Sequence, residues 1–196
     1  MWAQGCYAVP MRALAWAAVL AGALTACQAH PPAHWVQGGS RLDIPRARWS
    51  SGQGVVDLMP DGKVLGDGDH LFTIDVAGRV FARDNDPIAL LEMDGRLVGK
   101  DETSLGLVGL RNASPPGVEF AWLTIDDTGT VVRFDPEGGP HPDGVWSGCG
   151  PALRTCTLVT HVIALVQTGG RRQSRVHVGV GMGVGMGAGF GMFVMP

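Results

Sequence analysis

The chain has 196 residues, of which 15 are basic and 18 acidic, so its formal net charge is −3 with the histidines neutral. Binding of nucleic acid needs a basic stripe that neutralises phosphates, and the sequence has no Lys/Arg-rich run beyond Arg171-Arg172. We therefore exclude nucleic acid as a partner. Thirty glycines and 13 prolines are interspersed with short apolar blocks, which disordered chains lack, so the composition indicates one turn-rich globular domain.

The N-terminal region has the three parts of a secretory signal peptide. Arg12 is followed by an uncharged run, Ala13–Ala23, and small residues precede Cys27. The run is too short for a membrane helix, which needs about 20 apolar residues. We predict a signal peptide over residues 1–26, with Met11 as the true start because residues 1–10, including Cys6, add nothing that export requires.

The cleavage region Leu24-Thr25-Ala26-Cys27 resembles the lipobox of bacterial lipoproteins. The resemblance implies that Cys27 receives a diacylglyceryl thioether and becomes the mature N-terminus. The alternative is an ordinary signal peptide with an incidental cysteine. In enterobacterial lipoproteins an aspartate after the lipidated cysteine retains the protein at the inner membrane. Gln28 stands there instead, so the resemblance implies the periplasmic face of the outer membrane.

Removal of the signal peptide leaves 14 basic and 18 acidic residues, a net charge of −4, and two cysteines besides Cys27. In an oxidising compartment, Cys149 and Cys156 are most simply explained as a disulfide that closes a short loop. The alternative is a metal site that adds His141 and His161, although zinc sites usually pair their cysteines at closer spacing. We predict no metal and no cofactor.

Two regions follow the signal peptide. Residues 27–52 have no periodicity and are predicted to be the lipid anchor and a flexible tether, with Trp35 and Trp49 either packed on the domain or placed at the lipid headgroups. Residues 53–192 alternate blocks of about four apolar residues with Asp-Gly and other glycine turns. This pattern predicts an all-β domain of antiparallel hairpins, as a small barrel or a sandwich.

An internal repeat of about 17 residues runs through residues 62–109. Gly78–Leu91 matches Gly95–Val108 at an offset of 17, and a weaker copy begins at Gly62 and a fragment at Gly129. Each unit is predicted to be a strand, a polar turn and a second strand, and such units must pair in sequence to bury their apolar faces. The pattern loosely resembles the Asp-Gly-rich β repeats of bacterial surface proteins, which implies no activity.

Further strands are predicted in the second half. Val118–Ile125 and Thr130–Phe134 form a hairpin through a good turn, and Asp135–Gly144 reads as a loop. Thr157–Gln167 is apolar and β-branched on both faces, which predicts a central or buried strand. Gln167–Arg172 is then a turn within a long hairpin over residues 157–190.

The C-terminal tail alternates strictly, with glycine at every odd position from Gly179 to Gly191. Period two is strand geometry, so residues 176–192 are predicted to be a Gly/Met-rich strand. The spacing also resembles the glycine-zipper segments of some outer-membrane lipoproteins, which would allow membrane insertion or self-association of the tail.

Residues capable of catalysis mostly stand in turn contexts. His161 lies in an apolar segment, which favours a core histidine over a base. Trp122, Trp146 and Phe134 are assigned to the core rather than to a ligand platform. A carboxylate pair assembled in space stays open as an alternative. The acids predicted to act as turn residues are Asp61, Asp67, Asp94 and Asp143, each before glycine, together with Asp84, Asp86, Asp126 and Asp127.

The favoured hypothesis is a lipid-anchored, non-enzymatic β domain that serves as an interaction or structural module of the cell envelope. The first alternative is a small envelope hydrolase with loop-borne acids or a histidine, and the second is a membrane-associating protein that acts through its tail. A deep pocket with converging acids near His161 or His141 would favour the hydrolase. A closed sheet with acids at turn tips would favour the module.

Overall fold

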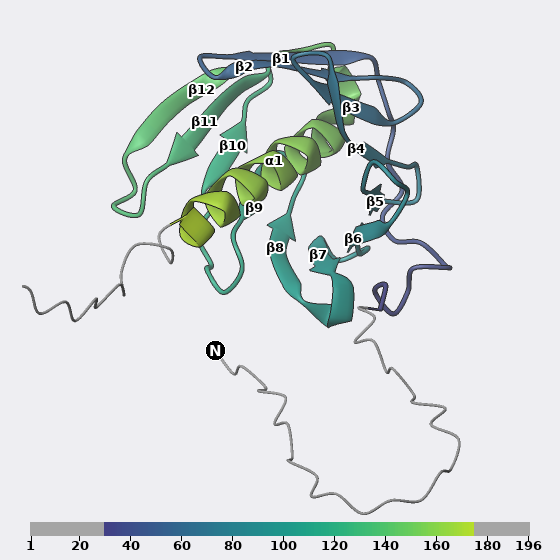
Figure 1. Cartoon of the computed structure of the whole chain (residues 1–196). Coiled ribbons are helices and arrows are strands. Elements are labelled where there is room, and N and C mark those ends of the chain that lie inside the picture. Colours follow the sequence, from purple (N-terminus) through teal and green to yellow (C-terminus); the bar gives the residue numbers. More distant parts are fainter. Residues whose placement is uncertain (1–29, 175–196) are drawn as a thin grey trace, which may run out of the picture.

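The computed structural model describes residues 30–174, with side chains described up to residue 168. Twelve antiparallel strands form one closed barrel, in which each strand pairs with its neighbours in sequence and the first pairs with the last. A helix crosses the interior of the barrel (Figure 1). The all-β prediction is confirmed, as a barrel rather than a sandwich. The elements are β1 (Ala47–Ser51), β2 (Gly54–Leu58), β3 (Lys63–Gly66), β4 (Asp69–Ile74), β5 (Arg79–Phe81), β6 (Pro87–Leu91), β7 (Arg96–Gly99), η1 (Lys100–Glu102), β8 (Ser104–Val108), β9 (Asn112–Ser114), β10 (Leu123–Ile125), β11 (Thr130–Phe134), β12 (Pro140–Ser147), η2 (Gly150–Ala152) and α1 (Leu153–Ser174).

One type of tight turn joins many of these strands. Between β4 and β5, the Asp75 amide donates to the Arg79 carbonyl at 3.0 Å, and the Gly78 amide donates to the Asp75 carbonyl at 3.1 Å. Gly78 has a φ of +75°, as expected for the left-handed residue that follows a type I turn in a hairpin. The residues that occupy the same place in other turns, with the same pair of hydrogen bonds, are Gly62, Asn85, Gly95, Gly129 and Gly138.

The 17-residue repeat corresponds to successive hairpins of the barrel wall. β5 and β7 start 17 residues apart, and so do β6 and β8. The Gly78 carbonyl accepts from the Leu91 amide at 2.8 Å, and the Gly95 carbonyl accepts from the Val108 amide at 2.7 Å, so both units close in the same way. The prediction that the units pair in sequence is confirmed.

The prediction of a strand at Thr157–Gln167 is wrong, because these residues belong to α1. Residues 155–164 are all buried, at no more than 7 % exposure. A surface helix shows an apolar stripe at a 3.6-residue period, but a helix enclosed on every side loses that stripe. The predicted burial of both faces is confirmed, whereas the predicted secondary structure is wrong. The turn predicted at Gln167–Arg172 is helical as well.

The predicted hairpin over residues 157–190 is consequently wrong for its described part. The predicted strand over residues 176–192 lies outside the residues that the structure describes. No helix in the described range is both long and apolar enough to cross a membrane.

The region predicted to be a tether is largely part of the domain. β1 begins at Ala47, Trp49 stacks on Trp146 with ring centroids 6.0 Å apart, and Leu42 is buried. Residues 38–46, called the strap from here on, bind backbone groups of the barrel; the Ser40 amide donates to the Leu91 carbonyl at 2.7 Å. Because the strap is held by irregular backbone hydrogen bonds, its residues show no hydrophobic period. The strap could therefore not be predicted from the sequence pattern.

The second half of the predicted loop Asp135–Gly144 is strand. β12 starts at Pro140 and pairs with β11 through a bulge, because the register shifts between the Thr130–Val145 pair and the Val132–Pro142 pair. A bulge accommodates prolines that would break a regular ladder. In the preceding hairpin, β10 begins only at Leu123, so the first half of the strand predicted from Val118 is irregular.

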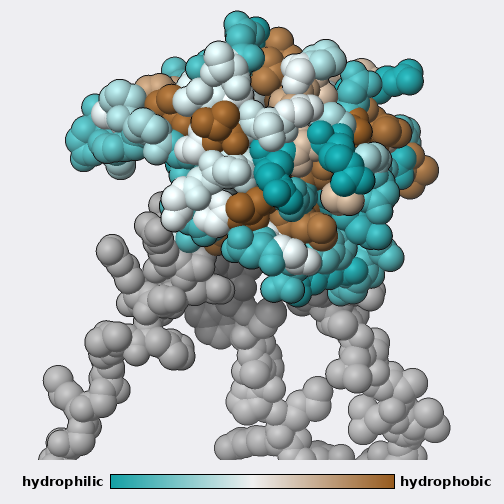
Figure 2. Space-filling model, turned by 90° about the horizontal axis from the view of Figure 1, so that it is seen from above, coloured by the Kyte–Doolittle hydropathy of each residue, from teal (hydrophilic) through white to brown (hydrophobic). Residues whose placement is uncertain are grey.

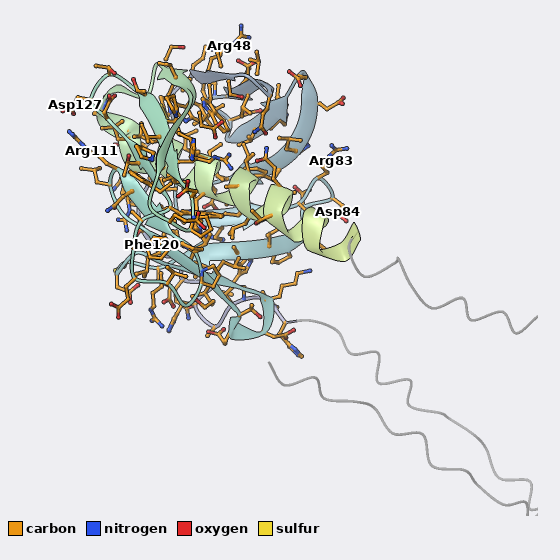
Figure 3. All side chains as sticks on the ribbon, turned by 90° about the vertical axis from the view of Figure 1, so that its left-hand side faces the viewer. Arg48, Arg83, Asp84, Arg111, Phe120 and Asp127 are labelled. Atoms are coloured by element: carbon orange, nitrogen blue, oxygen red, sulfur yellow. A yellow bond between two sulfur atoms is a disulfide. The ribbon has the colours of Figure 1, made fainter. Side chains whose placement is uncertain are left out.

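The two ends of the barrel differ. α1 begins at the entry end, which carries the β2–β3, β4–β5, β6–β7, β8–β9 and β10–β11 turns, and it runs toward the exit end, where the other connections lie. Arg111 and Asp127 belong to connections at the entry end and Arg83 and Asp84 to the β5–β6 turn at the exit end, and Figure 3 shows the two pairs on opposite sides of the molecule. On the face made by β1, β2 and β12, apolar and polar residues are interspersed (Figure 2).

Candidate functional site

A buried hydrogen-bond chain links the barrel wall to α1 at His161. The Trp122 indole Nε1 donates to His161 Nδ1 at 3.0 Å, and His161 Nε2 lies 2.8 Å from the Leu105 carbonyl oxygen. The Trp122 ring also packs edge-on against the imidazole, with centroids 5.4 Å apart. His161 thus bridges β8 and the start of β10 from inside the barrel.

The partners of His161 determine its protonation. An indole N–H can only donate and a carbonyl oxygen can only accept, so the imidazole is neutral and carries its proton on Nε2. Burial lowers the pKa of His161, and the hydrogen bond to the Leu105 carbonyl opposes this shift only in part. Since both ring nitrogens are occupied and the side chain is fully buried, His161 acts as a core residue, as predicted, and not as a base.

Other polar side chains fix the position of α1. The Trp146 indole donates to Thr160 Oγ1 at 2.9 Å, which ties the helix to β12. At the entry end, Thr155 Oγ1 donates to the Asp43 carbonyl in the strap at 2.6 Å. The predicted core role is confirmed for Trp146, which is 2 % exposed. Trp122 is partly buried and packs against the core. Phe134 is half-buried.

The Cys149 and Cys156 sulfurs are within disulfide-bonding distance, as predicted. The bond joins the segment before η2 to the first turn of α1 at the entry end. His141 lies instead on β12, and His161 lies deeper along α1, so the structure does not assemble the alternative metal site. Among the described residues, no three His, Cys, Asp or Glu side chains come together as metal ligands.

His141 pairs with an acid in the β11–β12 turn. Its Nε2 lies 2.9 Å from Asp135 Oδ2, and Asp135 Oδ1 accepts the Gly139 amide at 2.6 Å. The hydrogen bond from His141, followed by that from Gly139, lowers the pKa of the Asp135 carboxyl. An exposed carboxylate that binds its own turn serves that turn rather than a substrate.

Most of the aspartates predicted to act in turns accept hydrogen bonds from backbone amides. The Asp94 carboxylate accepts the Arg96 amide at 3.0 Å, and this bond is the main reason why the pKa of Asp94 is lowered. Asp126 accepts from the Thr128 hydroxyl and amide and from the Thr130 amide, and these bonds lower its pKa as well. The turn prediction is confirmed in the same way for Asp61 and Asp84. Asp67 also lies in a turn, between β3 and β4, but its carboxylate accepts the Val55 amide of β2 at 2.9 Å.

Asp143 is different from the other aspartates that precede glycine. It lies in the β12 bulge and forms a largely buried ion pair with Arg133 of β11. The Arg133 guanidinium also donates to Gln167 Oε1 of α1 at 3.3 Å. The turn prediction for Asp143 is wrong, because the bulge turns this side chain toward a cationic partner that no local pattern reveals.

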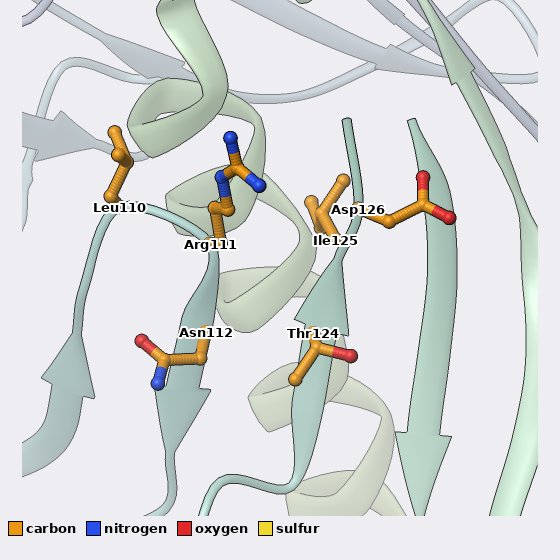
Figure 4. A pocket seen from close by; sticks show the side chains of 6 residues that line it. All are labelled: Leu110, Arg111, Asn112, Thr124, Ile125 and Asp126. Atoms are coloured by element: carbon orange, nitrogen blue, oxygen red, sulfur yellow. The ribbon is translucent and has the colours of Figure 1, made fainter. Parts of the chain in front are cut away.

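The surface holds open depressions, of which one lies over β9 and β10 (Figure 4). Its charged groups are engaged elsewhere: Arg111 pairs with Asp127, and Asp126 caps the β10–β11 turn. Asp126 points away from Arg111 in this view. The depression is lined by Leu110, Arg111, Asn112, Thr124, Ile125 and Asp126.

A clamp that the sequence analysis missed lies at η1. Asp101 and Glu102 both have left-handed backbone, with φ of +52° and +57°. Asp101 Oδ1 accepts the His30 amide at 2.9 Å, and Glu102 Oε1 accepts the Ala33 amide at 2.6 Å. In the sequence both acids lie in the polar turn of a repeat unit, and no local signal marks their distant partners.

The lipidation residue predicted from the sequence, Cys27, lies outside the described residues, three positions before His30. The described residues therefore provide one structural disulfide, one buried histidine bridge, a set of capped turns and the η1 clamp. Comparison with protein-family models, with curated proteins and with solved structures finds no match for this chain.

Proposed function

We propose that this chain is a lipoprotein of the bacterial cell envelope, anchored through Cys27 to the periplasmic face of the outer membrane. Its barrel acts as a non-enzymatic interaction or structural module. The anchoring is supported by the signal peptide and lipobox, and Gln28 supports the choice of membrane.

The observation that carries the module proposal is the position of α1. Barrels of this size usually enclose a ligand cavity or a channel. Here the interior is occupied by ten consecutive buried residues, Thr155–Ala164, and by the indole of Trp146. A ligand would therefore contact the outer wall or the turns of the barrel. At the turns, acids such as Asp94 and Asp126 are already bound to backbone amides.

Anchoring is tested by expressing the full chain in a bacterium and measuring the intact mass of the membrane-bound product. We expect a polypeptide that begins at an acylated Cys27. Cys27→Ser should abolish acylation, whereas the matched variant Cys6→Ser should change nothing, because residue 6 lies in the removed segment. A cytosolic product that begins at Met1 or Met11 with a free Cys27 thiol would contradict the proposal.

The module role is tested by affinity purification of the tagged, acylated protein from solubilised envelope, after crosslinking in the cell. We expect a stoichiometric envelope partner whose recovery is lost when exposed residues of the barrel wall are substituted. Hydrolysis of an envelope polymer by the pure protein, abolished by His141→Ala or Asp135→Ala, would instead establish the alternative hydrolase.

A further inference from the structure

The first described residues are fixed at the exit end of the barrel. The His30 amide donates to Asp101 Oδ1 at 2.9 Å, the Asp101 amide donates back to the His30 carbonyl at 3.0 Å, and Ala33 is held by Glu102. Trp35 then packs edge-on against Phe81, with ring centroids 5.0 Å apart. The described chain accordingly starts beside the β7–β8 connection (Figure 1).

The clamp that holds His30 uses strained backbone. Two consecutive residues other than glycine, Asp101 and Glu102, adopt positive φ, a conformation that persists only where surrounding contacts over-determine it. Here the carboxylates of these two residues accept the backbone amides of His30 and Ala33. Lys100 Nζ lies 3.5 Å from Asp86 Oδ2, which ties the clamp to the β5–β6 turn. These contacts therefore fix the position of His30 and Ala33 on the barrel.

Very little chain separates this point from the proposed anchor. Cys27 precedes His30 by three residues, and three residues span at most about 11 Å when fully extended. This reach is comparable with the headgroup region of one leaflet, roughly 5–8 Å thick. If Cys27 is acylated, as proposed above, the exit end cannot stand far from the lipid.

The other end of the described chain lies on the same side. α1 enters at the entry end and runs through the interior toward the exit end, where Arg133 of β11 holds Gln167. In Figure 3, α1 ends on the same side of the view as Asp84 of the β5–β6 turn, while Figure 1 shows β5 and β6 across the barrel from that end of the helix. The described chain therefore reaches and leaves the barrel at one end, and within residues 30–174 the opposite end carries turns, the strap and the disulfide.

We infer that the exit end, at the corner formed by η1 and the β5–β6 turn, rests on the leaflet that holds the acylated Cys27. The entry end then points away from the membrane and is the end presented to envelope partners. The corner carries both signs of charge, which suits zwitterionic headgroups better than a strongly anionic surface. Its charged residues are Arg83, Asp84, Asp86, Lys100, Asp101 and Glu102. This inference rests on the proposed acylation of Cys27.

Two positions at opposite ends of β6 make a matched test. Arg83 is exposed in the turn before β6, at the exit end, and Met93, at 82 % exposure, lies in the turn after β6, at the entry end. Acylation blocks Cys27 and the disulfide occupies Cys149 and Cys156, so Arg83→Cys or Met93→Cys supplies one free thiol. Each variant of the full-length acylated protein is labelled with a fluorophore and reconstituted into phosphatidylethanolamine–phosphatidylcholine vesicles that contain a headgroup-nitroxide lipid.

We expect strong quenching of the label at position 83 and several-fold weaker quenching at position 93. Insertion of about 12 Gly/Ser residues after Gln28 should reduce this difference, because a flexible linker frees the barrel from a fixed orientation. Equal quenching at both positions, or stronger quenching at position 93, would overturn the inferred orientation. A protein that lacks acyl mass and does not bind vesicles would refute the acylation itself, which is a separate outcome.

Discussion

The indole of Trp122 donates its N–H to Nδ1 of His161 at 3.0 Å, so the barrel wall and the helix inside it share one buried hydrogen bond. The Leu105 carbonyl accepts from the opposite nitrogen of the same ring. Three segments that are distant in sequence are therefore held together by one neutral imidazole, and this bridge is sensitive to protonation.

Stability should fall in mild acid because of His161. Burial lowers its pKa below the ordinary value of 6.5. Below that value the unfolded chain binds more protons than the folded protein, so the free energy of unfolding decreases as the pH falls from about 6.5 through the lowered pKa. Urea titrations at about pH 7.5, 6.5 and 5.5 measure this slope. Gln at position 161 can still accept from Trp122 and donate to Leu105 but does not titrate. A His161→Gln variant with the same slope as the parent would refute the assignment.

Two turn glycines with similar backbone should respond differently to alanine. Gly129 and Gly138 have φ of +87° and +85°. A Cβ at position 138 meets no atom within 4 Å, whereas one at position 129 would overlap the Trp146 carbonyl oxygen. Gly138→Ala should cost about 1 kcal/mol from the left-handed backbone alone. Gly129→Ala should cost about 2 kcal/mol more, because backbone must move.

Denaturant unfolding of both glycine variants gives the comparison directly. Gly138→Ala serves as the control for the backbone term. Equal losses in the two variants would mean that the close approach between Gly129 and the β12 backbone does not constrain the barrel.

Loss of the Cys149–Cys156 bond should weaken the domain moderately. The chain-entropy model gives about 2.5 kcal/mol for so short a loop. The double variant Cys149→Ala/Cys156→Ala should therefore unfold at lower denaturant concentration than the parent. Dithiothreitol should destabilise the parent to a similar extent and leave the double variant unchanged. A parent protein that does not respond to reductant, even when it is unfolded during the treatment, would contradict a disulfide.

The residue after the proposed lipidation site Cys27 should decide which membrane the protein reaches. Gln28→Asp introduces the residue that retains enterobacterial lipoproteins at the inner membrane, so we expect the acylated protein to move from outer-membrane to inner-membrane fractions. Gln28→Asn is the matched control and should leave the distribution unchanged. Sucrose-gradient fractionation of the envelope measures the outcome. Recovery of the parent protein in the inner membrane would contradict the proposed location.

Local turn chemistry made most of the barrel wall predictable. Asp-Gly pairs such as Asp94-Gly95 combine a capping carboxylate with a residue that tolerates positive φ, and both properties can be read from two letters. Because these turns recur at a fixed spacing, the strands between them and their sequential pairing could be predicted too. The pairing of Cys149 with Cys156 could be predicted from the number of cysteines together with the expected export signal.

The elements that the sequence did not reveal depend on long-range contacts. Residues 155–164 of α1 are enclosed on all sides, so this part of the helix lacks the amphipathic period by which a helix is recognised. The strap is fixed by single backbone hydrogen bonds, such as that from Ser40 to Leu91, and these leave no pattern. Asp143 in the β12 bulge pairs with Arg133, and Asp101 binds His30, so neither role could be assigned from neighbouring residues.

The seam between β1 and β12, where Trp49 stands opposite Trp146, constrains the order of assembly. α1 follows β12 in the chain yet lies inside the wall, so a seam that closed too early would shut the helix out. We therefore expect the pairing of β1 with β12 to form late, after α1 has packed against the open sheet. A pairing between strands so distant in sequence should then limit the folding rate more than the local hairpins do.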